Sequence, residues 1–298
     1  MVEVVLKKVS GLFHPLQITT LRFFIGGLTL LPFAIRSMRQ RRTVLLRKDY
    51  RFFALLGFLF VCVAMSIYQM GVTYTKASVV AVLFSCNPIF VTVLAHLILD
   101  EPIRRNHIIA LCLELVAVLL IIDPIHADLN PLGCALAVVS AVLFALYGVI
   151  GKKQTPRVGG IAVTCLCSLF GSVELFALLL FGHTEIGAAF FNALHLPLFV
   201  DVPIFSGIPL SAIPWLLYIG AINTGIGFVC HMLAMEKTSA QEASLIFFLK
   251  PMLAPLFALL FLHEEITVNM WLGIGCFLIG SGFSVLPGLI EQKRRIYY

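Results

Sequence analysis

Residues 75–109 read TKASVVAVLFSCNPIFVTVLAHLILDEPIRRNHII, and residues 238–272 read TSAQEASLIFFLKPMLAPLFALLFLHEEITVNMWL. With an offset of 163 residues, 10 of these 35 aligned positions are identical. The identical pairs are Thr75/Thr238, Ala77/Ala240, Phe84/Phe247, Pro88/Pro251, Ala95/Ala258, Leu97/Leu260, Leu99/Leu262, Glu101/Glu264, Ile103/Ile266 and Asn106/Asn269. Apolar residues are so common in this chain that they often match by chance, so the shared Thr, Pro, Glu and Asn residues are the stronger evidence for a repeat. The chain therefore contains two copies of one unit.

The composition of the chain is that of a membrane protein. Hydrophobic residues make up 60% of the 298 residues and charged residues 12%, and the mean hydropathy is +1.02. Soluble domains are about 45–50% apolar and about 25% charged. These values exclude a soluble enzyme with one buried core, and they exclude a disordered chain even more firmly.

A bilayer core requires about 20 apolar residues in a helix. Nine segments of the chain meet this requirement: 16–35, 52–72, 77–99, 107–123, 132–150, 159–182, 213–235, 239–262 and 268–290. Residues 1–13 are too short to span and lack the features of a signal peptide. Either the chain has nine spans, or it begins partway through a first span.

The distribution of Lys and Arg predicts the orientation of these spans. With the C-terminus in the cytoplasm, the inward-facing loops hold sixteen Lys and Arg residues, seven of them in residues 36–51, and the outward-facing segments hold three. We therefore predict a multi-pass protein of the cell membrane with a cytoplasmic C-terminus. The outer loop 183–212 contains no Lys or Arg; it could lie on the membrane surface, act as a lid, or be a tolerated insertion.

The repeat and the orientation together predict an inverted architecture. The loop 100–106 faces inward, whereas the matching loop 263–269 faces outward. An odd number of spans in each copy produces this reversal. Residues 132–290 hold five spans, and residues 1–123 hold four and a fragment, which favours ten helices with the first incomplete. Inverted repeats of this kind are typical of secondary transporters.

At this level the chain resembles the drug/metabolite transporter superfamily in its ten-helix form with two EamA-type repeats. The matching segments are Pro15-Leu16, Leu21 to Phe23, Thr75 to Ser78, Asn87-Pro88, Leu99 to Glu101, Lys237 to Ala240, Pro251, and Leu262 to Glu264. The resemblance covers essentially the whole chain and departs from the family at the N-terminus, where most of the first helix is missing. It implies export or uptake of small metabolites without ATP, through a central cavity lined by the first four helices of each repeat.

Four ionisable residues lie within the predicted spans: Arg22, Glu114, Glu174 and Lys250. Each costs about 2.5–3.5 kcal/mol on insertion scales, so each needs a partner or a function. Mutual neutralisation of two positive and two negative charges is the simplest explanation. Arg22 belongs to the Leu-Arg-Phe motif of the family resemblance and could hold an outer gate or tie helices together. For Glu114, packing or pairing is the favoured role.

Lys250 is the foremost candidate for a substrate-binding or coupling residue. It lies at the midpoint of span 239–262, beside Pro251 and one turn before Pro255, where the prolines free backbone carbonyls. Its repeat equivalent is Asn87, which precedes Pro88. A lysine in such a place can hold a carboxylate or titrate. The alternative is a structural ion pair with Glu174.

Three further residues complete the set of candidates. Glu174 could carry a proton, or serve as the counter-ion of Lys250. His231, the repeat equivalent of Tyr68, is more often a packing residue, with a cavity or proton-relay role as the alternative. We expect lipid, a small-molecule substrate and protons as a coupling ion to be the partners of the chain, and no nucleic acid.

The sequence predicts a transporter rather than an enzyme. Phosphate-loop, HExxH and GxSxG motifs are absent, and no cofactor is expected. The eight cysteines include no CxxC pair, so we interpret them as small apolar core residues. We therefore predict an all-α membrane protein that carries a small metabolite, such as an amino acid, by alternating access. A non-transporting scaffold and an integral membrane lipid enzyme are the alternatives.

Overall fold

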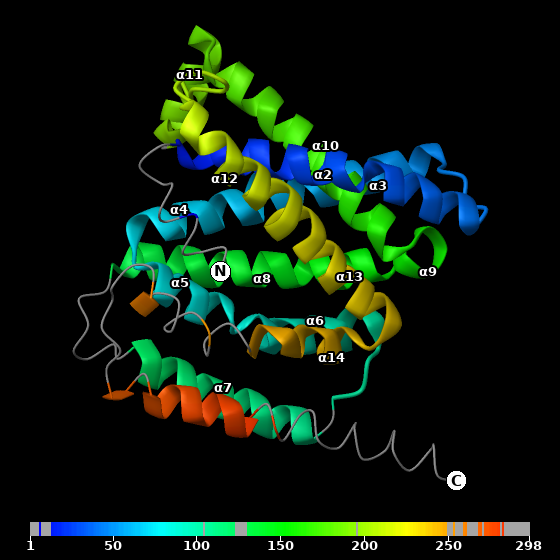
Figure 1. The fold of residues 1–298 in the computed structure, drawn as a ribbon, viewed down its shortest axis with the longest axis vertical. Coiled ribbons are helices and arrows are strands. Elements are labelled where there is room, and N and C mark those ends of the chain that lie inside the picture. The colour runs from blue at the N-terminus through cyan, green and yellow to red at the C-terminus, as the bar shows by residue number, and fades with distance from the viewer. Residues whose placement is uncertain are drawn as a thin grey trace.

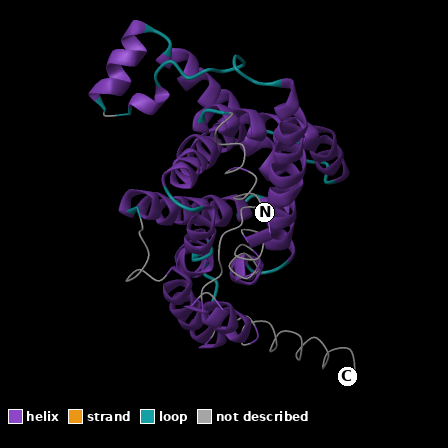
Figure 2. Ribbon diagram, turned by 60° about the vertical axis from the view of Figure 1, so that its left-hand side comes forward, coloured by secondary structure: helices purple, strands orange, loops and turns teal. Residues whose placement is uncertain are grey.

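The computed structural model describes residues 6, 13–103, 105–122, 130–194, 196–248, 253, 259–260, 268–269, 271–280 and 282. Helices and loops make up this described part, without strands (Figures 1 and 2). The first repeat contributes α2 (Pro15–Gln40), α3 (Arg47–Gly57), the π-helix η1 (Phe58–Met65), α4 (Ser66–Tyr74), α5 (Ala77–Phe84), α6 (Asn87–Leu99) and α7 (Arg105–Ile122).

The second repeat begins with α8 (Pro131–Lys152), α9 (Thr155–Val158), α10 (Gly160–Gly182) and α11 (Glu185–Ala193). Two 3-10 turns, η2 (Pro197–Phe199) and η3 (Leu210–Ala212), lead to α12 (Ile213–Leu217), the π-helix η4 (Tyr218–Ile226) and α13 (Gly227–Lys237). The short helix α14 (Ala240–Ser244) and the 3-10 turn η5 (Leu245–Phe248) follow, and a further helix covers 271–280.

The predicted spans agree with the helices of the described part. Six helical stretches are long and apolar enough to cross a membrane: Pro15–Gln40, Arg47–Tyr74, Val79–Leu99, Pro131–Lys152, Gly160–Gly182 and Leu210–Lys237. The predicted span 107–123 corresponds to α7, whose apolar part, His107–Ile121, is shorter. Most of the spans 239–262 and 268–290, and most of residues 1–13, lie outside the described residues.

Local sequence explains where two of the long helices begin. Asn130 accepts hydrogen bonds from the backbone N–H groups of Leu132 and Gly133, and Pro131 occupies the first turn of α8. His14 caps α2 in the same way, with Pro15 after it. A capping side chain satisfies the free amides of a first turn, and proline fixes a helical φ there without losing a bond.

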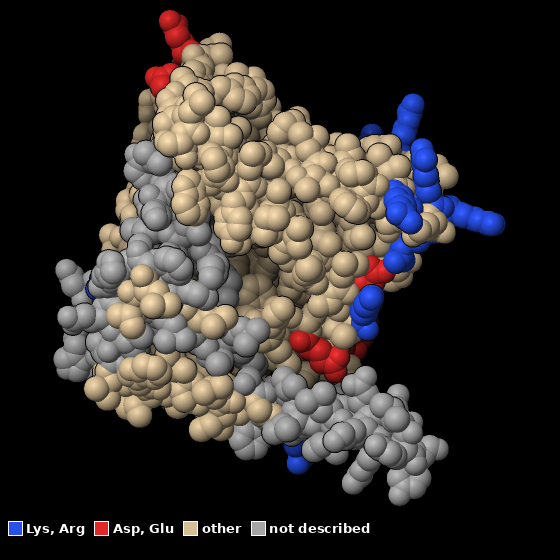
Figure 3. Space-filling view, viewed as in Figure 1, with Lys and Arg blue, Asp and Glu red and all other residues tan. Residues whose placement is uncertain are grey.

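The two repeats are inverted in space. In the first repeat, α5 and α6 end just before Glu101. In the second repeat, the equivalent span begins at Ala240. Glu101 accepts a hydrogen bond from the Ala240 backbone N–H at 2.9 Å, so the end of one span meets the start of the other. Figure 3 shows Lys and Arg gathered at this end of the molecule, which we call the basic end (residues 36–51, 152–157 and Lys237).

Two helices lie at the edge of the bundle, away from the main core. Helix 271–280 packs along α7, where Ile274 and Phe277 contact buried residues such as Ala117. Gly273 permits this approach, because a Cβ atom there would lie 2.8 Å from the Ala117 backbone oxygen. These are the fifth helices of the two repeats, and the family resemblance implies that the central cavity is lined by the first four helices of each repeat.

The predicted outer loop 183–212 is folded against the ends of two helices. It contains α11, η2 and η3, and Val202 packs on Leu16 of α2 and Leu179 of α10. Gln17 donates hydrogen bonds to the backbone oxygens of Ile204 and Ser206, at 3.3 and 3.2 Å. The segment therefore covers the ends of α2 and α10 that lie opposite the basic end.

Candidate functional site

Aromatic rings from both repeats form one connected group in the middle of the bundle. We call it the aromatic cluster. It consists of Phe23, Phe60, Tyr68 and Phe84 from the first repeat, and Phe144, Tyr147, Phe228, His231 and Phe247 from the second. Seven elements supply these side chains, and all except Phe228 are buried.

Equivalent residues of the two repeats meet in this cluster. Phe84 contacts its repeat equivalent Phe247, with ring centroids 5.9 Å apart. Tyr68 contacts Phe84 at 4.9 Å, and its repeat equivalent His231 contacts Phe247 at 5.2 Å. The four rings therefore contact one another in the order Tyr68, Phe84, Phe247, His231. The first two residues of this series are the repeat equivalents of the last two, in reverse order. A pseudo-two-fold axis relating the repeats would pass between Phe84 and Phe247, because the midpoint of two equivalent residues lies on such an axis.

Helix α8 supplies the other side of the cluster. Phe144 lies 5.4 Å from Phe84, 5.8 Å from Phe247 and 5.5 Å from His231, on which it stacks. One turn further, Tyr147 stacks on Phe60 with centroids 3.8 Å apart and planes 4° from parallel. Stacked and edge-on rings contribute about 0.5–1.5 kcal/mol per pair beyond the burial of their area.

A π-helix interrupts the same span in each repeat. Segment η1 covers Phe58–Met65 and carries Phe60, and η4 covers Tyr218–Ile226, which corresponds to residues 55–63 in the repeat alignment. Single π turns are rare and frequently lie at functional sites. A hydropathy profile does not reveal a π-helix, since an apolar segment has the same hydropathy whether it forms an α-helix or a π-helix.

The span 77–99 is broken beside the cluster. Helix α5 ends at Phe84, and α6 begins at Asn87 with Pro88 in its first turn. Asn87 is fully buried and its amide nitrogen donates a hydrogen bond of 2.9 Å to the Ala141 oxygen, one turn before Phe144 on α8. Within the described residues its amide oxygen accepts no hydrogen bond. This oxygen is a polar group beside an apolar cluster.

The structure brings three of the predicted residues together: Tyr68, His231 and Asn87. Lys250, Pro251 and Pro255 lie outside the described residues, so their predicted roles stay predictions.

Glu174 lies elsewhere, on α10, where that helix packs against η1. In the described part of the chain, no hydrogen bond, ion pair or ring contact joins it to the cluster. Arg22 is buried on α2, with its guanidinium carbon 4.8 Å from the Phe23 ring centre, so it borders the cluster. Glu114 is buried on α7, and neither of its carboxylate oxygens has a hydrogen-bond partner among the described residues.

Residues that sequence reasoning did not identify form a polar network at the basic end. Three ion pairs among the described residues join the repeats there: Arg41–Glu236, Arg157–Asp49 and Lys152–Glu101. Burial raises the pKa of Glu101, but hydrogen bonds from the Ala240 N–H and the Lys152 ammonium outweigh it, and the pKa is lowered. The match of Glu101 with Glu264 in the repeat alignment is the signal that could have drawn attention to it.

Metal binding has no support in the described residues, which contain no group of three His, Cys, Asp or Glu side chains able to hold an ion. The eight cysteines are free. Cys62, Cys86, Cys165 and Cys167 are buried as expected, whereas Cys112 and Cys230 are exposed, so the interpretation of all eight as core residues is wrong for these two. Both lie on apolar helices, at positions that a bilayer would cover.

These features define a polytopic membrane protein of two inverted helical repeats that share an aromatic cluster. Residues 2–123 and 131–286 each match the EamA-like transporter family, and the chain belongs to that family. It is a membrane transporter of the drug/metabolite transporter superfamily.

Several transporters of this kind are similar to the chain. An uncharacterized transporter of Clostridium kluyveri is 36% identical over 278 residues, which cover 91% of this chain and 84% of that one. The uncharacterized transporter YoaV of Bacillus subtilis is 27% identical, over 87% of this chain and 83% of its own. A crystal structure with 14% identity superposes with a TM-score of 0.66, over 96% of this chain and 94% of that chain, which shows the likeness of fold.

Proposed function

We propose that the protein is a secondary transporter that carries a small metabolite by alternating access, with the substrate held at the aromatic cluster. The contact between Phe84 and Phe247 carries this proposal. When two inverted repeats exchange conformations, a site on their pseudo-two-fold axis is common to both states. We place the cluster on that axis because the repeat equivalents Phe84 and Phe247 contact each other within it.

The chemistry of the cluster favours an amphipathic substrate. Its rings offer apolar faces, while Asn87, Tyr68 and His231 supply a small number of polar groups, which is the usual composition of a small-molecule site. An amino acid or a related compound with an apolar side chain fits this description. Protons are the proposed coupling ion, with His231 and Glu174 as the candidate carriers.

Replacing His231 or Tyr68 with Phe tests the site. Each change keeps an aromatic ring of similar size and removes the polar atoms, so folding should persist. We expect substrate flux into proteoliposomes to fall by about tenfold or more, as loss of one hydrogen bond of about 1.4 kcal/mol implies. The assay would use a mixture of labelled amino acids, with and without a pH gradient.

The matched control is Val116→Leu, on the exposed face of α7. Normal flux in both His231→Phe and Tyr68→Phe would contradict the proposed site. A folded wild-type protein that moves no substrate in either direction would favour the non-transporting scaffold, and turnover of bilayer lipid would favour the membrane enzyme.

We also propose that the basic end lies in the cytoplasm of the cell, because Lys and Arg are retained there during insertion. Reporter fusions at residues 45 and 298 should be active only as cytoplasmic reporters, and a fusion at residue 195 only as an exported one. An exported reporter at residue 45 or 298 would contradict this orientation.

A further inference from the structure

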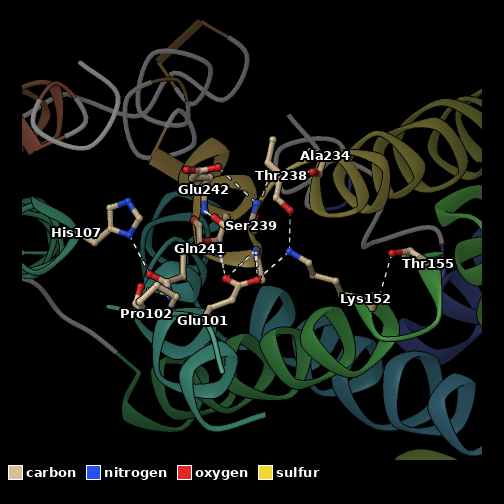
Figure 4. A network of polar contacts seen from close by, with 12 residues as sticks. Glu101, Pro102, His107, Lys152, Thr155, Ala234, Thr238, Ser239, Gln241 and Glu242 are labelled. Carbon is tan, nitrogen blue, oxygen red and sulfur yellow. Dashed lines mark hydrogen bonds and ion pairs between the residues drawn. The ribbon is translucent and has the colours of Figure 1, made fainter. Parts of the chain in front are cut away.

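The network around Glu101 fixes one turn of the second repeat to the end of a helix of the first. Glu101 Oε1 accepts hydrogen bonds from the Ala240 backbone N–H at 2.9 Å and from the Lys152 ammonium at 2.8 Å. Glu101 Oε2 accepts a hydrogen bond from the Gln241 backbone N–H at 3.3 Å (Figure 4). Lys152 also donates to the Thr238 backbone oxygen at 2.7 Å. The Glu101 carboxylate therefore binds the turn between α13 and α14 in two ways. It contacts the start of α14 directly, and it contacts Thr238, after the end of α13, through Lys152.

A second pair of side chains supports the same contact. Gln241 donates to the Pro102 backbone oxygen at 3.3 Å, and its amide oxygen lies 2.9 Å from His107 Nδ1 (Figure 4). Gln241 and His107 are both buried. The loop after α6 is thus joined to the first turn of α14 by backbone and side-chain bonds, all at the basic end.

The electrostatics of this contact favour a strong but reversible bond. The first amides of a helix have no acceptor within the helix, and they carry a partial positive charge that attracts a carboxylate. Charge-assisted bonds of this kind are roughly twice as strong as neutral ones. Breaking them exposes amides, an ammonium and a carboxylate that water can solvate, so the separated state has no buried unpaired charge.

The position of the contact relates it to the central site. Going backward along the chain from Glu101, α6 and then α5 lead to Phe84. Going forward from Ala240, α14 and then η5 lead to Phe247. These two spans contact each other through Phe84 and Phe247, and at the basic end through Glu101 and Ala240. A rotation about the contact between Phe84 and Phe247 would separate the ends of the spans at the basic end and bring their opposite ends together.

We propose that Glu101 is the latch that closes the central site toward the basic end, and that its release from Ala240 and Gln241 opens that end during transport. This inference rests on the alternating access proposed above. The turn between α4 and α5 is the repeat equivalent of the turn between α13 and α14, since Ala77 corresponds to Ala240. Opening of the basic end therefore accompanies closure over the α4–α5 turn.

The state of the α4–α5 turn can be read from its own amides. Lys76, the residue before α5, corresponds to Ser239, which caps α14 by accepting a bond from the Glu242 N–H. A lysine side chain has no acceptor atom. Lys76 therefore cannot cap α5 as Ser239 caps α14, and hydrogen exchange of the first amides of α5 is the measurement we choose to follow that end.

Hydrogen–deuterium exchange of the purified full-length protein in nanodiscs tests the latch without any substrate. The variant Glu101→Gln keeps the size of the side chain and removes its charge. We expect exchange of the Ala240 and Gln241 amides to become at least about tenfold faster, and exchange at residues 77–79 to become slower. Glu101→Asp, which keeps the charge at a shorter reach, should lie between Glu101→Gln and the wild type.

Glu236→Gln is the matched control, because it removes another ion pair between the repeats at the same end. It should speed exchange at Gly160, whose N–H donates to Glu236, and leave residues 77–79 unchanged. Faster exchange at Ala240 in Glu101→Gln with no change at residues 77–79 would overturn the latch and leave Glu101 a local structural residue. Unchanged exchange at Ala240 would overturn it as well.

The exchange experiment and the flux assay can fail separately, so the latch and the proposed function are tested apart. Opposite changes at the two turns in a protein that moves no substrate would support the latch and count against transport. Normal flux with no opposite change would overturn the latch alone. If Glu101→Gln fails to fold, Lys152→Met supplies the second test: it removes the bond to Thr238 and one partner of Glu101, and the same opposite changes are expected at smaller size.

Discussion

Replacement of Lys250 with Met is expected to lower substrate flux by about 10- to 150-fold while membrane insertion and folding persist. Lys250 lies outside the described residues, and the expectation comes from the repeat register. Lys250 follows Phe247 by three residues, as Asn87 follows Phe84. Asn87 is buried beside the aromatic cluster. The register therefore predicts a cation at the level of the proposed substrate site, in the middle of its span.

The size of the effect follows from the loss of a charged partner. A hydrogen bond to a charged group contributes about 1.5–3 kcal/mol, which corresponds to about 10- to 150-fold in binding. Met keeps the length and the apolar stem of the lysine. Flux in proteoliposomes and the melting temperature of the purified variant would be measured together, since only the first should change.

An ion pair with Glu174 is the competing explanation for Lys250. If the two charges only neutralise each other, Lys250→Met should lower stability, and adding Glu174→Gln should restore both stability and flux. The described residues show no ion-pair partner for Glu174, which leaves this alternative to the experiment. Full transport by Lys250→Met alone would remove the residue from the site and leave Asn87 and His231 as the next candidates.

The arrangement of the spans could be predicted because hydropathy, charge and repetition act over long stretches. About 20 apolar residues are needed for each crossing, and the orientation indicated by sixteen Lys and Arg residues stays a prediction. An error of two residues at a boundary does not change either result. Inversion was predicted from the repeat of residues 75–109 in residues 238–272, because the matching loops 100–106 and 263–269 are predicted to face opposite sides.

The composition of the site could not be predicted in the same way. Nothing in the sequence distinguishes Phe144 from the many other phenylalanines on apolar helices, since a ring that faces the bundle and one that faces lipid look alike in hydropathy. The π-helix η1, which presents Phe60, depends on a local change of backbone hydrogen bonding that leaves no compositional trace. Tyr68 and His231 became candidates because they occupy equivalent positions in the two repeats, and the axis that relates the repeats also relates these two positions.

The charged residues illustrate a different limit of sequence reasoning. Ionisable groups within spans drew attention because they are costly in lipid, yet Glu174 and Glu114 make no ion pair among the described residues. The three cross-repeat ion pairs instead join residues at the ends of helices, such as Glu101 and Lys152, where charges are common and individually uninformative. Their partners are far apart in sequence, so only the fold reveals them.

Replacement of Gly171 with Ala is expected to lower the free energy of unfolding by about 1–3 kcal/mol, the range for overpacking a core. Gly171 of α10 faces Gly57 of α3 across the boundary between the repeats. A Cβ atom at Gly171 would lie 2.3 Å from the Gly57 backbone oxygen and 2.7 Å from Val61 Cβ. Since the first of these atoms belongs to the backbone, α3 and α10 must separate to admit the methyl group.

The control for this change is Gly275→Ala, in helix 271–280, where an added Cβ meets no atom of the described residues within 4 Å. Alanine favours a helix over glycine by about 1 kcal/mol, so this variant should be as stable as the wild type or slightly more so. Thermal unfolding in detergent would compare the two. A fall for Gly171→Ala alone shows that backbone contact between α3 and α10 limits the packing of the repeats; equal stability of both variants would contradict that close approach.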